Sequence, residues 1–162
     1  MEKREISVKD IMTANFISVG PDMPIADAAR VLADNKFDGV PVVEDGSKLV
    51  GILTEYDLIS SGSAVHLPTL QTVLKNLSAF REDRKAFEAE TREISSLRVR
   101  DIMNKDPLTL PESVTYEEVI KTFQEHHRVN PIPVINDQNI VVGVVSRFDV
   151  LKPYRMISEK SS

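Results

Sequence analysis

The chain contains no cysteine and no tryptophan among its 162 residues. Without cysteine there is no thiolate nucleophile, no disulfide framework and no zinc or iron-sulfur site built on sulfur ligands. The same absence fits a reducing compartment such as the cytoplasm. A chain of this length buries roughly 70% of its unfolded surface, so an apolar core can hold the fold without disulfides or a structural metal.

Long apolar runs and excess positive charge are also missing. No stretch approaches the roughly 20 apolar residues of a membrane-spanning helix, and residues 1–6 lack the apolar core of a signal peptide. We therefore expect no membrane partner and a cytoplasmic protein. The net charge of -5 disfavours binding to phosphate backbones, so nucleic acid is an unfavoured partner.

The chain does contain one unit that occurs twice. The segment VKDIM at residues 8–12 returns 91 residues later as VRDIM at residues 99–103. The segment GILTEYDL at residues 51–58 returns 92 residues later as GVVSRFDV at residues 143–150. The second copy has therefore gained one residue between these segments. Such a repeat predicts two units of similar structure.

Each copy contains an amphipathic helical pattern. Apolar residues at the spacing i, i+3, i+4 and i+7 predict helices over residues 23–35 and 116–127: Ile25, Ala28, Ala29 and Leu32 in the first copy, and Tyr116, Val119, Ile120 and Phe123 in the second. Asp22 and Pro24 mark the start of the first helix. Thr115 and Glu118 predict a capping box at the start of the second.

Each helix is followed by two β-branched runs that predict a hairpin. The runs are residues 40–43 and 49–53 in the first copy, and residues 132–135 and 140–145 in the second. Asp45-Gly46 is a strong turn signal between the first pair. Short strands at residues 16–19 and 107–110 precede the helices, and a last helix begins at Thr54 or Ser146. The predicted fold is α+β, with the order strand, helix, strand, strand, helix in each copy.

A unit with three short strands cannot cover both faces of its sheet. Two copies packed sheet to sheet as a pseudo-twofold pair would cover the exposed faces and leave a cleft on each side. Clefts of this kind are common positions for small ligands. The predicted organisation is a first repeat at residues 7–60, a helical linker at 61–98, a second repeat at 99–155 and a C-terminal tail at 156–162.

The linker has a helical pattern of its own. Its apolar residues follow a spacing of three and four, with some positions filled by other residues: Leu70, Val73, Leu77, Phe80, Phe87 and Ile94. This stripe either packs along the two repeats or forms a dimer or partner contact. A coiled coil would need about three to four clean heptads.

The residues that could carry chemistry follow the last strand of each copy. Thr54 precedes Asp57 by three residues, and Ser146 precedes Asp149 by the same spacing. A hydroxyl followed by a carboxylate at this spacing is a helix-capping arrangement. The same geometry presents free backbone N–H groups and a hydroxyl to a phosphate, and the carboxylate can accept both hydroxyls of a ribose. On these residues alone, capping and ligand binding both stay open.

In their order and combination these motifs resemble a tandem pair of CBS domains, also called a Bateman module. The resemblance rests on V-x-D-I-M at the start of each repeat, on the VPVV and IPVI strands, and on the closing pattern of Gly, two apolar residues, Ser or Thr, and Asp. It implies a regulatory module, not an enzyme. Such modules bind AMP, ADP, ATP or S-adenosylmethionine between their repeats and require no cofactor or metal.

The resemblance also implies which residues line each cleft. In the family, the ribose-binding Asp and the phosphate-facing Ser or Thr come from one repeat, and much of the adenine pocket comes from the other. One cleft would combine Ile52, Thr54 and Asp57 with Leu108, Val129, Asn130 and Pro131. The other would combine Val144, Ser146 and Asp149 with Thr13, Ile17, Phe37, Asp38 and Gly39.

Charge predicts that the two clefts differ. Arg147 follows Ser146, whereas Glu55 occupies the same place after Thr54. Near a first helical turn, a guanidinium favours bound phosphate and a carboxylate disfavours it, each by roughly 1 kcal/mol. We therefore add Arg147 to the ligand-binding residues and expect the Asp149 cleft to bind phosphorylated nucleotide more tightly. Lys152 and Arg155 either face phosphate or are surface cations compatible with the helix dipole.

Other functions find less support in the residues. There is no glycine-rich phosphate loop, His/Glu metal spacing or nucleophile elbow, which disfavours an enzyme. His126 and His127 are adjacent and point about 100° apart in a helix, so we expect no metal site there. The alternative is an interaction or dimerisation module that uses the linker helices and has vestigial clefts. By analogy with the family we expect a homodimer and an effector protein that the sequence does not identify.

Overall fold

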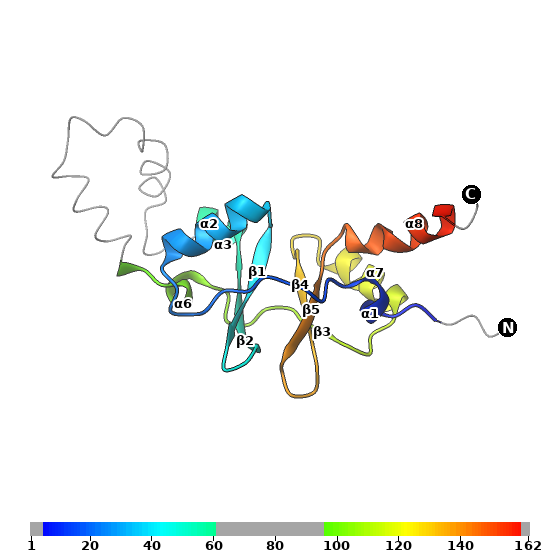
Figure 1. Ribbon diagram of the computed structural model, residues 1–162, viewed down its shortest axis with the longest axis horizontal. Coiled ribbons are helices and arrows are strands. Elements are labelled where there is room, and N and C mark those ends of the chain that lie inside the picture. The colour runs from blue at the N-terminus through cyan, green and yellow to red at the C-terminus, as the bar shows by residue number, and fades with distance from the viewer. Residues whose placement is uncertain (1–4, 61–95, 160–162) are drawn as a thin grey trace, which may run out of the picture.

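The computed structural model describes residues 5–60 and 96–159 (Figure 1). Two small sheets lie side by side in the middle of the molecule, and helices lie on the outer side of each sheet. The predicted linker helix, with its apolar stripe from Leu70 to Ile94, lies outside the described residues.

The first half contains the predicted hairpin. β1 (Gly39–Glu44) pairs with β2 (Lys48–Thr54) in antiparallel orientation, and α3 (Glu55–Ser60) follows directly. Asp45, Gly46 and Ser47 between the strands all have positive φ angles. This is the backbone conformation that an Asp-Gly turn favours.

The second half has three strands in its sheet. β4 (Ile132–Ile135) pairs with β5 (Val141–Val145) in antiparallel orientation and with β3 (Leu110–Pro111) in parallel orientation. β3 is shorter than the strand predicted at residues 107–110, and the strand predicted at residues 16–19 is reduced to one parallel bridge between Val19 and Val42. β3 begins three residues later than predicted and includes Pro111, and Glu112 N then donates to Ile135 O over 3.0 Å. In both segments the beginning of the predicted strand is unpaired, and its last residue is paired.

The two long helices bury the predicted apolar faces. α2 (Ile25–Asn35) buries Ile25, Ala28 and Leu32 against the first sheet, and α7 (Tyr116–Glu125) buries Val119 against the second. After β5, a short 3-10 helix η1 (Asp149–Leu151) leads into α8 (Lys152–Glu159). The helix predicted to begin at Ser146 therefore begins three residues later, with Asp149 in its first turn.

The starts of the two long helices differ between the halves. α7 has the predicted capping box, in which Thr115 N donates to Glu118 Oε2 over 2.9 Å and Glu118 N donates to Thr115 Oγ1 over 3.3 Å. α2 begins after Pro24, which makes no side-chain cap bond. The predicted start residue Asp22 forms an ion pair with Arg100 instead.

The short helix that opens each repeat packs into the opposite half. α1 (Val8–Ile11) contributes Val8 and Ile11 to the core that contains Val119 of α7. α6 (Val99–Ile102) contributes Val99 to the core that contains Leu32 of α2. Each core therefore needs residues from both sequence repeats, because neither repeat alone covers its sheet.

Glycine permits a close approach where the chain crosses back after each exchanged helix. Thr13 exchanges two backbone hydrogen bonds of 2.8 and 3.1 Å with β5, and Asn104 exchanges two of 2.9 Å with β2. A Cβ added to Gly143 would lie 3.1 Å from Thr13 O, and one added to Gly51 would lie 2.7 Å from Asn104 O. A side chain at either position would push the crossing segment away from its strand.

The hairpin tips join the two sheets symmetrically. Leu49 N donates to Asn139 O over 3.0 Å, and Val141 N donates to Ser47 O over 2.9 Å. Val141 and Asn139 are the counterparts of Leu49 and Ser47 at the repeat shift of 92 residues. Such reciprocal contacts are what a pseudo-twofold pair requires. The structure has the predicted α+β arrangement of two paired repeats.

Candidate functional site

A cleft of about 270 Å³ beside Asp149 is lined by residues of both halves. Its lining includes all the residues predicted for it except Arg147: Thr13, Ile17, Phe37, Asp38, Gly39, Val144, Ser146 and Asp149. The lining also includes residues that the sequence did not assign to it: Asn15, Phe16, Lys36, Val40, Pro41, Asn130, Pro131 and Phe148. Part of one wall is the crossing segment after α1, so the exchange of α1 between the halves helps to build this cleft.

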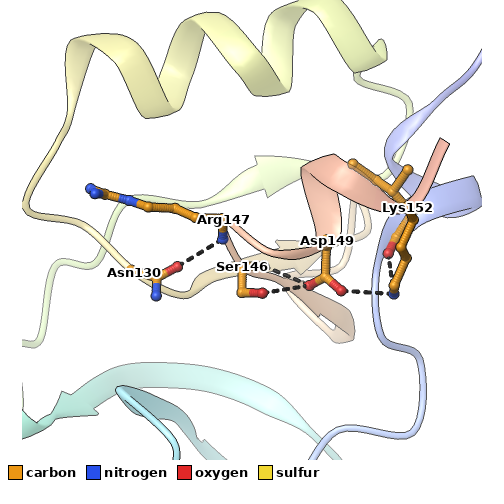
Figure 2. A network of polar contacts seen from close by, with 6 residues as sticks. Asn130, Ser146, Arg147, Asp149 and Lys152 are labelled. Carbon is orange, nitrogen blue, oxygen red and sulfur yellow. Dashed lines mark hydrogen bonds and ion pairs between the residues drawn. The ribbon is translucent and has the colours of Figure 1, made fainter. Parts of the chain in front are cut away.

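The Asp149 carboxylate is buried and bonded on both oxygens (Figure 2). Its Oδ2 accepts from Ser146 N over 2.7 Å and from Ser146 Oγ over 3.0 Å. Its Oδ1 lies 2.7 Å from Lys152 Nζ, which also donates to Ile11 O over 2.5 Å. The lysine therefore connects the aspartate in η1 to the carboxyl end of α1.

A second cleft of about 150 Å³ lies beside Asp57. It is lined by all seven residues predicted for it: Ile52, Thr54, Asp57, Leu108, Val129, Asn130 and Pro131. Tyr56, Asn104, Pro107 and Arg128 complete the lining. Asp57 Oδ2 accepts from Thr54 N over 2.8 Å and from Thr54 Oγ1 over 2.7 Å, so the cap in this cleft matches the cap in the other.

Asn130 belongs to both clefts. Its Nδ2 donates to Asp38 Oδ2 over 2.5 Å, and its Oδ1 accepts from Arg147 N over 3.1 Å. Asn130 and Pro131 line each cavity, so the two clefts share a wall.

Arg147 is oriented differently from the expectation. Figure 2 shows its side chain extending away from the Asp149 carboxylate. The guanidinium donates to His127 O and lies 6.0 Å from the centre of the Phe123 ring. Because these contacts hold it on the outside of the cleft, it does not supply positive charge beside Ser146.

The cations that do line the clefts were missed by the sequence argument. Lys36 lines the Asp149 cleft, and Arg128 lines the Asp57 cleft. Glu55 lines neither cavity. Arg128 directly precedes Val129, Asn130 and Pro131, which were assigned to the Asp57 cleft, and this adjacency was an available signal. Lys36 offered the same signal, because it directly precedes Phe37, Asp38 and Gly39, which were assigned to the Asp149 cleft.

Two titratable side chains of α7 have shifted pKa values. Burial, with a smaller contribution from Tyr154, raises the pKa of Tyr116, whose hydroxyl donates to Val150 O over 2.6 Å. Hydrogen bonds from Thr115 lower the pKa of Glu118. Neither residue lines a cleft, so these shifts belong to the fold and not to the candidate site.

Within residues 5–60 and 96–159, no group of three or more His, Asp or Glu side chains is placed to hold a metal ion. No helix in this part of the chain has the length and apolar content to cross a bilayer. The polar groups that line the clefts are carboxylates, hydroxyls, amides and the cationic side chains of Lys36 and Arg128. This set of groups suits a polar organic ligand.

The family model described as CBS domain matches residues 8–63 and 99–155. The chain is 28% identical over 148 residues to an inosine-5'-monophosphate dehydrogenase of Methanocaldococcus jannaschii. The aligned region covers 91% of this chain and 22% of the dehydrogenase. The chain therefore spans about a fifth of that relative.

Two solved structures of CBS-pair proteins share the fold. One is CBSX2 from Arabidopsis thaliana in complex with AMP, with a TM-score of 0.69, 23% identity, and coverage of 94% of this chain and 98% of that one. The other is the CBS domain pair of protein MJ0100 in complex with 5'-methylthioadenosine and S-adenosyl-L-methionine. It has a TM-score of 0.60, 22% identity, and coverage of 91% and 98%.

Proposed function

Because the chain belongs to the CBS domain family as a tandem pair, we propose that it is a stand-alone regulatory module that binds an adenosine derivative between its repeats. The observation that carries the proposal is that each cleft combines a capped aspartate from one half with apolar side chains from the other. AMP, ADP, ATP and S-adenosylmethionine all contain the adenosine that such a cleft suits. The ligands of CBSX2 and MJ0100 support this class.

The Asp149 cleft is the main site in this proposal. Its volume of about 270 Å³ is close to the lower limit of roughly 300 Å³ for small-molecule sites, whereas the Asp57 cleft has about 150 Å³. The ribose binds Asp149 through hydroxyl donation, and the adenine lies against apolar residues such as Ile17 and Pro131. Lys36 supplies the positive charge for a phosphate in place of Arg147.

The mechanism is linkage between ligand and arrangement of the halves. Both clefts take residues from the two halves, so a ligand binds best when the halves sit in one relative position. The bound ligand shifts the population toward that position by no more than its differential affinity. A partner protein that contacts one arrangement then responds to the ligand. No catalytic step is part of this function.

A thermal-shift panel tests the proposed ligand class. AMP, ADP, ATP and S-adenosylmethionine are compared with GMP and with inorganic phosphate. A specific ligand at 100 times its Kd adds about 2.7 kcal/mol of stability, a clear rise in melting temperature. We expect at least one adenosine ligand to stabilise the wild type, and Asp149→Asn to reduce that shift.

Two outcomes would contradict the proposal. One is no stabilisation by any adenosine ligand, which would favour the interaction module with vestigial clefts. The other is an equal shift with GMP or phosphate, which would indicate an anion site that does not recognise adenosine. Arg30→Gln is the matched control, because this exposed cation pairs only with Asp27 among the described residues and is remote from both linings.

We propose that the module forms a homodimer, and exposed apolar residues support this. Tyr56 and Ile59 in α3 are 60% and 61% exposed, and their counterparts at the shift of 92 residues, Phe148 and Leu151, are 83% and 53% exposed. Repeated apolar positions suit a self-complementary contact. Light scattering tests it: Phe148→Ser with Tyr56→Ser should give monomers. The effector and a cytoplasmic location remain predictions of the sequence.

A further inference from the structure

The two cleft aspartates differ in how much hydrogen-bond capacity is already used. An ionised carboxylate has about four acceptor positions, two on each oxygen. Asp57 Oδ2 accepts twice, from Thr54 N and Thr54 Oγ1, and its Oδ1 accepts from none of the described residues. Asp149 Oδ2 also accepts twice, from Ser146, but its Oδ1 is occupied by Lys152. Counting contacts with residues 5–60 and 96–159, one acceptor position is left on Asp149 and two on Asp57.

This difference matters for a ribose, because its vicinal diol carries two O–H donors. Asp57 can accept both donors on Oδ1, which no residue in the described part of the chain occupies. Asp149 can accept one donor beside Lys152 Nζ, and a second donor would have to displace the ammonium group. The ammonium group also donates to Ile11 O, so displacing it would break two charge-assisted hydrogen bonds, to Asp149 Oδ1 and to Ile11 O. The displacement would form one new hydrogen bond, from the second ribose hydroxyl to Asp149. The lysine therefore stays in place.

Lys152 is not needed to orient Asp149. The cap formed by Ser146 has the same pair of bonds as the cap formed by Thr54, and Asp57 holds its position without a lysine. Lys152 contacts Oδ1 of Asp149 and connects the aspartate to the end of α1 (Figure 2), whereas Oδ1 of Asp57 has no such contact with the described residues.

We propose that Lys152 is a positioning residue that restricts the Asp149 cleft to one ribose hydroxyl. This inference rests on the proposed function, because it assumes that an adenosine ligand binds at Asp149. Its consequence is a specificity that the sequence motifs do not predict. The Asp149 cleft discriminates weakly between a ribose and a deoxyribose, although the motif around it is the same as in the first repeat.

The test compares AMP with 2'-deoxyAMP and 3'-deoxyAMP by calorimetry on the full chain. All measurements use the Asp57→Asn variant, so that the measured affinity comes from the Asp149 cleft alone. With Lys152 present, we expect the affinities for the three nucleotides to agree within about twofold. In Lys152→Met, both hydroxyls reach the carboxylate, and AMP should bind about tenfold more tightly than either deoxy form, the factor for one hydrogen bond of about 1.4 kcal/mol.

The controls separate this proposal from simpler explanations. Lys121→Met removes an equally charged side chain that is 73% exposed on α7 and should leave the ratio unchanged. Lys152→Gln removes the charge but keeps a donor for Ile11 O, and it replaces Lys152→Met if that variant does not fold. A failure of both variants to fold would show that the lysine serves the fold, and it would overturn the proposal.

The results for this inference and for the proposed function can be told apart. If AMP binds the Asp57→Asn protein but the ratio of AMP to deoxyAMP is the same with and without Lys152, the lysine proposal is wrong and the ligand class stands. A tenfold preference for AMP in the presence of Lys152 also overturns it. If the wild type binds none of the three nucleotides, the role proposed for Lys152 is wrong. The proposed function itself fails only if ADP, ATP and S-adenosylmethionine also give no stabilisation in the thermal-shift panel.

Discussion

The Asp57 and Asp149 clefts have the same cap but different surroundings. In both, a carboxylate oxygen accepts from the backbone N–H and the hydroxyl three residues before it, over 2.7 to 3.0 Å. Around that cap, the cleft volume, the lining cation and the presence of Lys152 all differ. Duplication has therefore kept what the backbone turn requires, whereas the side chains around the turn have diverged.

The comparison also shows that capping engages one carboxylate oxygen of each aspartate and leaves the other available for further contacts. Capping uses Oδ2 in both aspartates. Oδ1 contacts Lys152 in Asp149 and none of the described residues in Asp57, and in our proposal this second oxygen decides how many ribose hydroxyls each cleft accepts. The motif alone does not predict affinity, because the motif describes only the capping oxygen.

The largest expected difference between the two halves is the loss of stability when a side chain is added to the glycine beside each crossing segment. Gly51→Ala places a Cβ 2.7 Å from Asn104 O, a backbone atom that cannot move aside easily. Gly143→Ala meets Met12 Sδ at 2.6 Å, but that side chain is flexible, and Thr13 O lies farther away at 3.1 Å. We expect a loss of about 3 kcal/mol for Gly51→Ala and about 1 kcal/mol for Gly143→Ala in urea unfolding. Equal losses would contradict the asymmetry.

A smaller effect is expected from the aspartates in the absence of ligand. Asp149→Asn weakens the cap and leaves Lys152 without its ion pair, whereas Asp57→Asn weakens a cap alone. The lysine side chain is 37% exposed, so solvent compensates in part. We expect losses of about 2 kcal/mol for Asp149→Asn and about 1 kcal/mol for Asp57→Asn in chemical unfolding. The reverse order would show that the ion pair adds no stability.

The helix starts provide a third comparison. Thr115→Ala removes the capping box of α7 and should cost about 1 kcal/mol. Asp22→Ala removes an exposed ion pair near α2 and should cost less than about 0.5 kcal/mol. Thermal unfolding of both variants by circular dichroism measures the difference. A larger loss for Asp22→Ala would mean that α2 depends on this pair for its start.

The smallest effect concerns pH. Bonds from Thr115 lower the pKa of Glu118 in the folded protein, so its ionised form is favoured by folding. This contribution is present above the pKa of the unfolded chain and is lost as the pH falls through the lower, folded pKa. Glu118→Gln should therefore reduce the dependence of melting temperature on pH below about 4.3. An unchanged slope in this range would contradict the assignment.

The sequence predicted the local structure well, and the residues it assigned to each cleft, except Arg147, line the two cavities. The helical periodicity, the Asp45-Gly46 turn and the Thr115 capping box each depend on residues within a few positions of one another. The residues of each cleft could be assigned because the repeat and its resemblance to a known family carry long-range information. The orientation of Arg147 could not, because its contacts with His127 and Phe123 depend on how α7 packs beside the turn.

By itself, the sequence determined that this protein is a pair of similar α+β units with a hydroxyl and a carboxylate after each last strand. Periodicity and turn chemistry act over a few residues, so they can be recognised without coordinates. Only the tertiary structure decided that α1 and α6 exchange halves and that Lys152 joins Asp149 to Ile11. Ile11 and Lys152 lie more than 100 positions apart in the sequence. Such distant residues come into contact only because the two repeats bury shared cores.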